Sequence, residues 1–402
     1  MNWANRWFAI ISGGIRDYNP NAWEITWDQD DPKWQYLFRP FFLAIDIESG
    51  RNFWEPIAAH TVPNWWSQIP EHDINHIPYA IANPLVLDIF DENGYPISMP
   101  GVKPDGHADL MYAGDLNGNL YTIKLYRDNA GFDNNLLCIS VHRTKPISQA
   151  HYDDNIYRGE NQPITVTPVA AFDANKHLRI YFGTGKFDDV EAAGKDDKSD
   201  KEPMSFYCLV EDLNTECNGN SVSVTLLGKN ITIPSDYCTS DLNTHRWVTA
   251  EGQPDGNDCF QCVFDFDQPG ERVVDSALVA GGLVFVTTFI PNDDPCVSGG
   301  GDSYLYVFDY MCRPLSYDPL QYSGLEHEWL GLGGGWTPGN LPPGTQASAV
   351  RASLGEGMPS HPVLDSSGKY VLVQTSDAQI HRIRVELPVR PLYLKGWKEK
   401  GE

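Results

Sequence analysis

The chain has 402 residues, of which 54 are acidic and 29 basic, and its formal net charge is −25. Such an acidic surface repels phosphate backbones and anionic headgroups, which argues against binding to nucleic acid or to a membrane surface. Its 35 glycines, 29 prolines and 12% aromatic residues favour many short strands joined by tight turns. No apolar run reaches the ~18 residues that a membrane-spanning helix needs.

Five segments share one pattern: a short extended run, a hydrophobic run that ends in Gly or Thr, and an alternating strand that ends near Asp. The alternation in LYTIKLY (120–126) and IHRIRVEL (380–387) predicts half-buried strands, whereas LVFVTTF (283–289) predicts a strand covered on both faces. In chain order the segments lie within residues 7–54, 83–126, 163–213, 271–310 and 358–387.

Turn signals separate the strands within these segments, as at Asn117-Gly118, Gly281-Gly282 and Ser367-Gly368. Small antiparallel meanders that recur along a chain are typical of propeller blades. We therefore expect an all-β, quinoprotein-like β-propeller, distorted by insertions, with at least five blade-like meanders in one domain over residues 1–402. A β-sandwich is the alternative fold.

The insertions differ in character. Residues 52–78 carry Trp54, Trp65 and Trp66, which are candidates for partner binding if exposed and otherwise pack into the first meander. Residues 188–202 form a charge run, and residues 329–346 form a connector rich in Gly and Pro. Residues 211–266 are predicted to be a cysteine-rich insertion within the propeller domain.

The even number of cysteines favours disulfides and an oxidising compartment. Short loops close most readily, which favours the pairs Cys217–Cys238, Cys259–Cys262 and Cys296–Cys312, and leaves Cys138 to pair with Cys208. A structural zinc site is the competing interpretation of Cys259 and Cys262, but no second CxxC or HxxxH motif accompanies them. The N-terminal sequence has no signal-peptide pattern, so we expect a fragment or mature portion of a longer exported protein.

Several segments resemble, in order, the C-terminal propeller of the PilC/PilY family of type IV pilus biogenesis and tip-associated proteins. They are DGHADLMYAGDLNGNLYTIKL (105–125), PITVTPV (163–169), IYFGTGKFDD (180–189), GERVVDSALVAGGLVFVTTFIPNDDPCVSGGGDSYLYVFD (270–309) and GMPSHPVL (357–364). The resemblance covers most of residues 80–400. It implies a distorted β-propeller and a location in the periplasm or at the outer membrane, cell surface or pilus tip. It also implies a role in pilus assembly, retraction control and adhesion, with pilin or minor pilins and a host or surface ligand as partners.

The resemblance also points to calcium, which prefers six to eight oxygen ligands. Asp105 and Asp109, with the main-chain carbonyl of His107, match the second half of the family's loop, and Asp91 and Asn93 match its first half. Residues 95–104 would then be inserted between the halves. We expect these five residues to surround one Ca²⁺; the alternative is two ordinary Asx-turns without metal, which the nearby Lys103 favours.

Other motifs point away from catalysis, and no catalytic residue is assigned. DLNGN (115–119) is predicted to be a hairpin turn, and GTGK (183–186) lacks the frame of a nucleotide-binding loop. A quinoprotein-type dehydrogenase and a purely structural extracellular propeller remain alternative functions. Dehydrogenases of that kind commonly have adjacent cysteines, and this chain has none.

Overall fold

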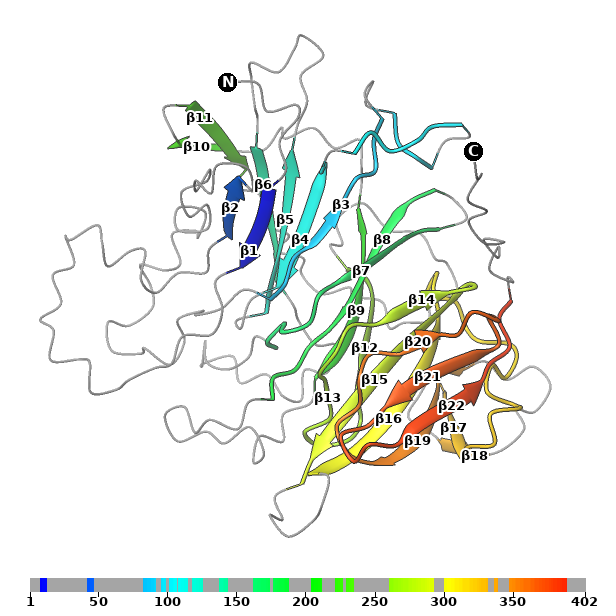
Figure 1. Cartoon of the computed structure of the whole chain (residues 1–402). Coiled ribbons are helices and arrows are strands. Elements are labelled where there is room, and N and C mark those ends of the chain that lie inside the picture. The colour runs from blue at the N-terminus through cyan, green and yellow to red at the C-terminus, as the bar shows by residue number, and fades with distance from the viewer. Residues whose placement is uncertain are drawn as a thin grey trace, which may run out of the picture. The chain divides into compact units, whose positions relative to one another are not determined.

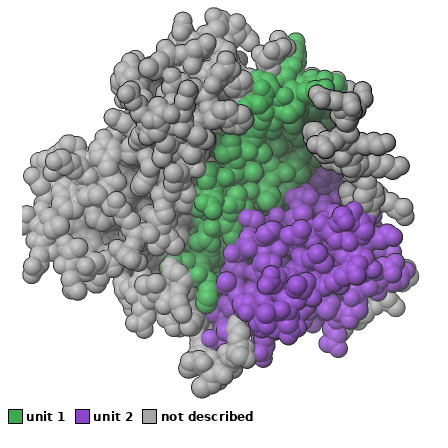
Figure 2. Space-filling view, viewed as in Figure 1, with its two compact units in different colours: residues 1–244, 254–273 green, residues 245–253, 274–402 purple. Residues whose placement is uncertain are grey.

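A computed structural model describes seventeen ranges of the chain (Figure 1): 8–12, 42–46, 82–91, 95–98, 101–106, 108–114, 118–125, 137–143, 162–173, 176–187, 204–211, 221–226, 229–234, 260–292, 300–331, 336–338 and 347–388. Within these ranges all regular elements are strands and none is a helix, which confirms the predicted all-β class. Accordingly, they contain no helix with the length and apolar character to cross a membrane. The chain divides into unit 1 (residues 1–244 and 254–273) and unit 2 (residues 245–253 and 274–402), coloured in Figure 2.

Unit 1 contains two four-stranded antiparallel sheets. The first has the order β3-β4-β5-β6, formed by β3 (Leu85–Leu87), β4 (Leu110–Gly114), β5 (Asn119–Leu125) and β6 (Leu137–Arg143). The second has the order β12-β9-β8-β7, formed by β7 (Val169–Phe172), β8 (Leu178–Gly183), β9 (Ser205–Glu211) and β12 (Phe260–Asp265). The remaining strands are β1 (Phe8–Ser12) paired with β2 (Phe42–Asp46), β10 (Ser221–Leu226) paired with β11 (Lys229–Pro234), and β13 (Arg272–Val273).

The second sheet is completed by a strand from far along the chain. β12 pairs with β9 although residues 212–259 lie between them. The residues of β12 therefore fall inside the range 211–266 that the sequence analysis assigned to an insertion.

The core of unit 1 lies where the two sheets face each other. This core includes the buried side chains of Tyr112 of β4, Ile164, Ile180 and Phe182 of β8, and Tyr207 of β9. Every residue of β4 is buried, because the strand is covered on both faces. Gly114 ends β4 directly against Ile164, and a Cβ atom at this position would lie 2.1 Å from the Ile164 Cγ2 atom. Close packing at this point therefore requires glycine.

Unit 2 contains two sheets that share one hydrophobic core. The larger has the order β15-β16-β19-β17-β18, with β14 added to β15; its strands are β14 (Leu278–Ala280), β15 (Leu283–Pro291), β16 (Gly301–Asp309), β17 (His327–Gly331), β18 (Trp336–Pro338) and β19 (Ala347–Glu356). The smaller has the order β20-β21-β22, formed by β20 (Val363–Leu364), β21 (Tyr370–Gln374) and β22 (Ile380–Arg384). β15 is almost entirely buried and β22 alternates in exposure, as the sequence predicts.

The described strands show no closed ring of blades, so the propeller itself stays a prediction. Side chains of β15, β16 and β19 pack against Val371, Val373 and Ile383 of the smaller sheet. Face-to-face packing of two sheets occurs in β-sandwiches and also between neighbouring propeller blades. The described part of unit 2 is compatible with both folds.

One turn recurs in both units, and we call it the Asp-led turn. In each example the Oδ1 atom of an aspartate accepts a hydrogen bond from the backbone N–H four residues later. The turns are Asp91–Tyr95 (2.8 Å), Asp173–His177 (3.0 Å), Asp309–Arg313 (3.3 Å) and Asp365–Lys369 (3.1 Å). The residue before the donor has a left-handed backbone at Lys176, Cys312 and Gly368, with φ of 70°, 62° and 65°. The strands that end near Asp in the sequence therefore end in a common turn, in which the carboxylate replaces a backbone acceptor.

Candidate functional site

The predicted calcium loop joins β3 to β4 at one end of the first sheet of unit 1. Leu87 of β3 pairs with Leu110 of β4, so the chain leaves the sheet at Asp88 and returns at Asp109. Between these points it forms an inner hairpin, in which Phe90 bridges Pro96. The two halves of the predicted loop are thus brought to the same end of the sheet, as the sequence analysis expects of a split site.

Asp109 ties the two halves together. Its side chain is buried, and its Oδ2 atom accepts hydrogen bonds from the backbone N–H groups of Ile89 (2.8 Å) and Phe90 (2.9 Å). These bonds satisfy two donors that the end of β3 would otherwise leave unpaired. Asp109 therefore holds the two halves of the loop together.

Asp88 is a further acidic residue at this place, which the sequence analysis did not select. Its Oδ2 atom accepts a hydrogen bond of 2.7 Å from the backbone N–H of Gly106 in the second half of the loop. Its Oδ1 atom is buried and meets no hydrogen-bond donor in the described part of the chain. A buried carboxylate oxygen without a donor is unfavourable, and a cation could relieve this. Because Asp88 falls within the alternating stretch LVLDIF, it reads from sequence as an ordinary strand residue.

The other predicted calcium ligands give a mixed picture. Asp91 uses its Oδ1 atom in an Asp-led turn, as the metal-free alternative requires. Asp105 is partly buried, whereas Asn93 and His107 lie outside the described residues. In the described part of the chain, no group of three or more His, Cys, Asp or Glu side chains could hold a metal ion. The calcium site stays a prediction.

The cysteine predictions need one correction. Cys208 is a free thiol, so the predicted bridge between Cys138 and Cys208 is wrong. The strand register explains this: Cys208 lies opposite Cys262 in the second sheet, whereas Cys138 lies opposite Lys124 in the first. Pairing the cysteines by loop length could not reveal this register, because β9 pairs with β12, which lies beyond residues 212–259.

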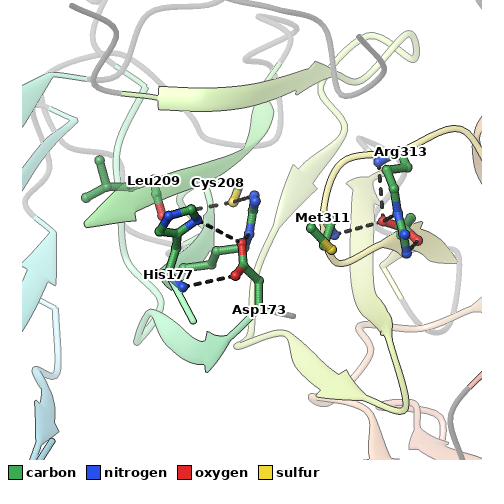
Figure 3. A network of polar contacts seen from close by, with 8 residues as sticks. Asp173, His177, Cys208, Leu209, Met311 and Arg313 are labelled. Atoms are coloured by element: carbon green, nitrogen blue, oxygen red, sulfur yellow. Dashed lines mark hydrogen bonds and ion pairs between the residues drawn. The ribbon is translucent and has the colours of Figure 1, made fainter. Parts of the chain in front are cut away.

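The environment of Cys208 makes its thiol unreactive. The side chain is fully buried beside Arg179, whose Nη1 atom lies 3.9 Å from the sulfur (Figure 3). Burial raises the pKa of Cys208 to about 11, an effect that the positive charge of Arg179 only partly offsets. Only the thiolate is a good nucleophile, so Cys208 has no catalytic character near neutral pH.

Arg179 is held in turn by Asp173, the first residue of an Asp-led turn. The Arg179 Nε atom donates to the Asp173 Oδ2 atom over 2.8 Å, and both side chains are buried. His177, half exposed at the end of the turn, approaches the same carboxylate (Figure 3). Although Cys, His and Asp lie near one another here, the carboxylate pairs with Arg179 and the thiol is protonated. The group is structural.

Several remaining predictions concern other cysteines and the aromatic insertion. Cys312 is disulfide-bonded in the structure. Trp54, Trp65 and Trp66 lie outside the described residues. The same applies to the side chains of the remaining cysteines: Cys138, Cys217, Cys238, Cys259, Cys262 and Cys296.

No protein-family model and no solved structure match the chain. Curated proteins do match. The chain is 26% identical to a type IV pilus biogenesis factor PilY1 homolog of Xylella fastidiosa (strain Temecula1), in an alignment 231 residues long that covers 51% of the chain. It is 22% identical to the type IV pilus biogenesis factor PilY1 of Pseudomonas aeruginosa (strain PAO1), in an alignment 386 residues long that covers 82% of the chain. The chain is a distant relative of the PilY1 family.

The relationship to PilY1 confirms the resemblance seen in the sequence motifs. The matched region covers 33% of the Pseudomonas PilY1 and 13% of the Xylella homolog, so the chain spans a third or less of these relatives. The role that their names give, type IV pilus biogenesis, is that of the whole proteins.

Proposed function

We propose that the chain acts in type IV pilus biogenesis, as a region of a PilY1-like factor that binds pilus components. The observation that carries this proposal is the match to PilY1 over 82% of the chain. The proposed role is binding and assembly, not catalysis. In support, the thiol of Cys208, a potential nucleophile, is kept protonated by burial.

The proposal includes a β-propeller as the fold of the region. Support comes from the two four-stranded antiparallel sheets of unit 1, each of which has the size and pairing of a propeller blade. The Asp-led turns add support, because the same turn recurs in successive segments of the chain as repeated units require.

We place the protein outside the cytoplasm, at the cell surface, pilus tip, outer membrane or periplasm. The disulfide at Cys312 supports this location, because such bonds persist in oxidising compartments. The proposed partners are pilin or minor pilins, together with a host or surface ligand for adhesion. Trp54, Trp65 and Trp66 stay candidates for these contacts.

Binding of this kind can be tested with purified protein and the soluble domains of the host's pilin and minor pilins. We expect a complex with at least one of them by size-exclusion chromatography and calorimetry. Failure to bind any of them would leave a structural propeller as the better assignment. A quinone absorbance in the purified protein would instead indicate a quinoprotein dehydrogenase.

Calcium binding at the 88–109 loop is the second part of the proposal. The unpartnered Asp88 Oδ1 atom supports it, since this oxygen is already buried beside the second half of the loop. Asp88 would join Asp91, Asn93, Asp105, Asp109 and the His107 carbonyl as ligands. Bound calcium would tie the two halves of the loop to the end of β3 and could couple calcium concentration to a partner contact.

We expect calorimetry with Ca²⁺ on chelator-stripped protein to show one site, and Asp88→Asn or Asp105→Asn to weaken it at least about 10-fold. Asp267→Asn is the matched control, because it removes an exposed carboxylate elsewhere in unit 1 and should leave binding unchanged. Equal heats from all four proteins, or none from any, would mean that this loop contains only Asx-turns.

A further inference from the structure

The smaller sheet of unit 2 has one buried face and one exposed face. Val371, Val373 and Ile383 point into the shared core. The alternating positions on the other face are Leu372 and Gln374 of β21, and Ile380, Arg382 and Arg384 of β22, together with Val363 of β20 and Tyr370. We call this set the outer face of the β20–β22 sheet. β21 and β22 lie at the front of unit 2 in Figure 1. In Figure 2, which has the same view, the surface of unit 2 on this side faces the viewer (purple).

Two arginines on the outer face are held in place by tyrosine rings. The guanidinium carbon of Arg382 lies 3.8 Å from the centroid of the Tyr370 ring. That of Arg384 lies 4.9 Å from the centroid of the Tyr322 ring, which the 319–323 turn supplies. Stacking of this kind restricts the rotamers of the two side chains while it leaves their N–H donors at the surface. Both arginines are therefore ordered before any partner arrives.

The local charge is opposite to that of the chain as a whole. β20, β21 and β22 contain two arginines, one histidine and no acidic residue, in a chain with net charge −25. The carboxylates beside the sheet accept hydrogen bonds of their own, and Asp365 also lies within electrostatic range of Arg382. Asp365 accepts hydrogen bonds in its own turn, and Glu386 accepts one from the side chain of Gln321. The outer face thus offers positive charge on an otherwise acidic molecule.

Apolar groups continue the same surface. Ile380 is 70% exposed and precedes the two arginines on the same face of β22, and Val363 on β20 is 45% exposed. Arginine and tyrosine are enriched at protein-binding surfaces, and the exposed aliphatic side chains add apolar area beside them. A merely solvated sheet face would favour polar residues in these positions.

The spacing of the arginines indicates the geometry of the ligand. Arg382 and Arg384 are two positions apart on one strand, so their Cα atoms are about 6.5 Å apart. Alternate residues of an extended peptide have the same spacing, which allows one carboxylate to meet each guanidinium. A third alternate position would then meet Ile380.

We propose that the outer face of the β20–β22 sheet docks an extended acidic segment of a partner polypeptide, with acidic residues at alternate positions followed by an apolar residue. Two arginine–carboxylate pairs fix the register of the segment, and its apolar side chain covers Ile380. The proposal rests on local charge and geometry and does not depend on the pilus assignment.

The test uses the full chain and a labelled peptide, Glu-Ser-Glu-Ser-Leu, with fluorescence polarisation as the readout. Saturable binding should weaken as salt rises. Arg382→Gln and Arg384→Gln should each lower the affinity about 10-fold, which corresponds to the loss of one charge-assisted pair. Lys369→Gln, which removes an exposed positive charge beside the same sheet, should change it less than about twofold. Thermal unfolding confirms that each variant stays folded.

Three results of the peptide experiment would overturn the proposal. They are the absence of peptide binding by the wild-type chain, equal binding of a Lys-Ser-Lys-Ser-Leu peptide, and equal affinity for the wild-type chain and the Arg382→Gln/Arg384→Gln double variant. Binding to phosphatidylglycerol vesicles that requires both arginines, without binding to the peptide, would also overturn it and indicate an anionic lipid surface instead.

Discussion

A single carboxylate fixes each Asp-led turn, but its surroundings decide how much the turn contributes to stability. At Asp365 the side chain is solvated and its hydrogen bonds stay within the turn. At Asp173 the same carboxylate also neutralises Arg179 in the interior of unit 1. Aspartates that form the same turn therefore differ in how much they contribute to the stability of the fold.

We predict that Asp173→Ala destabilises the protein by about 3–5 kcal/mol, because the buried Arg179 charge loses its partner. Asp365→Ala, the matched control, removes the same kind of turn bond at the surface and should lower stability far less. Denaturant unfolding measures both. Similar effects of the two substitutions would show that the Asp173–Arg179 pair adds nothing to the turn.

A second residue-scale prediction concerns the thiol of Cys208. Since its pKa is raised to about 11 by burial, the native protein should not react there with iodoacetamide at pH 8. The residue should be alkylated once the protein is unfolded in denaturant without reductant. Mass spectrometry after digestion identifies the modified site. Rapid alkylation of Cys208 in the native protein would contradict the buried environment described above.

At the scale of elements, local hydrophobic patterns in the sequence correctly predicted the strands whose partner strands are near in sequence. LVFVTTF reads as a strand covered on both faces and lies in the buried strand β15, and IHRIRVEL reads as half-buried and includes β22. Pairing across long gaps was not predictable, because period-two alternation does not identify the partner strand. The strand β12 and the register of Cys208 opposite Cys262 are the consequences.

Contacts of single glycines with other elements also escape sequence patterns. Gly114 ends a predicted strand, yet only the structure shows its contact with Ile164. We predict that Gly114→Ala destabilises the protein by about 1–3 kcal/mol through overpacking. In an Ile164→Gly background the added cost should be smaller, since both Ile164 atoms nearest to the new methyl group, Cγ2 and Cβ, are gone. Additive free energies of unfolding in this double-mutant cycle would exclude a steric cause.

At the scale of the whole molecule, the family relationship carries more functional information than the geometry of the candidate site. The motifs that revealed it were visible in the sequence, and the alignment with PilY1 extends over 82% of the chain. Asp88 could not be predicted as a possible calcium ligand, because its contact with Gly106 depends on the path of the chain between β3 and β4. Likewise, the arginines of β22 are stacked on tyrosines from two other segments.

The central claim is that this region acts in type IV pilus biogenesis, and the most direct measurement is the number of surface pili in the host bacterium. Codons for residues 82–388 would be deleted from the chromosome, and pili would be counted by electron microscopy and by immunoblotting of sheared fractions. We expect a large loss of surface pili, at unchanged pilin levels in whole cells, that an intact copy of the gene restores. Wild-type piliation in the deletion strain would contradict the claim.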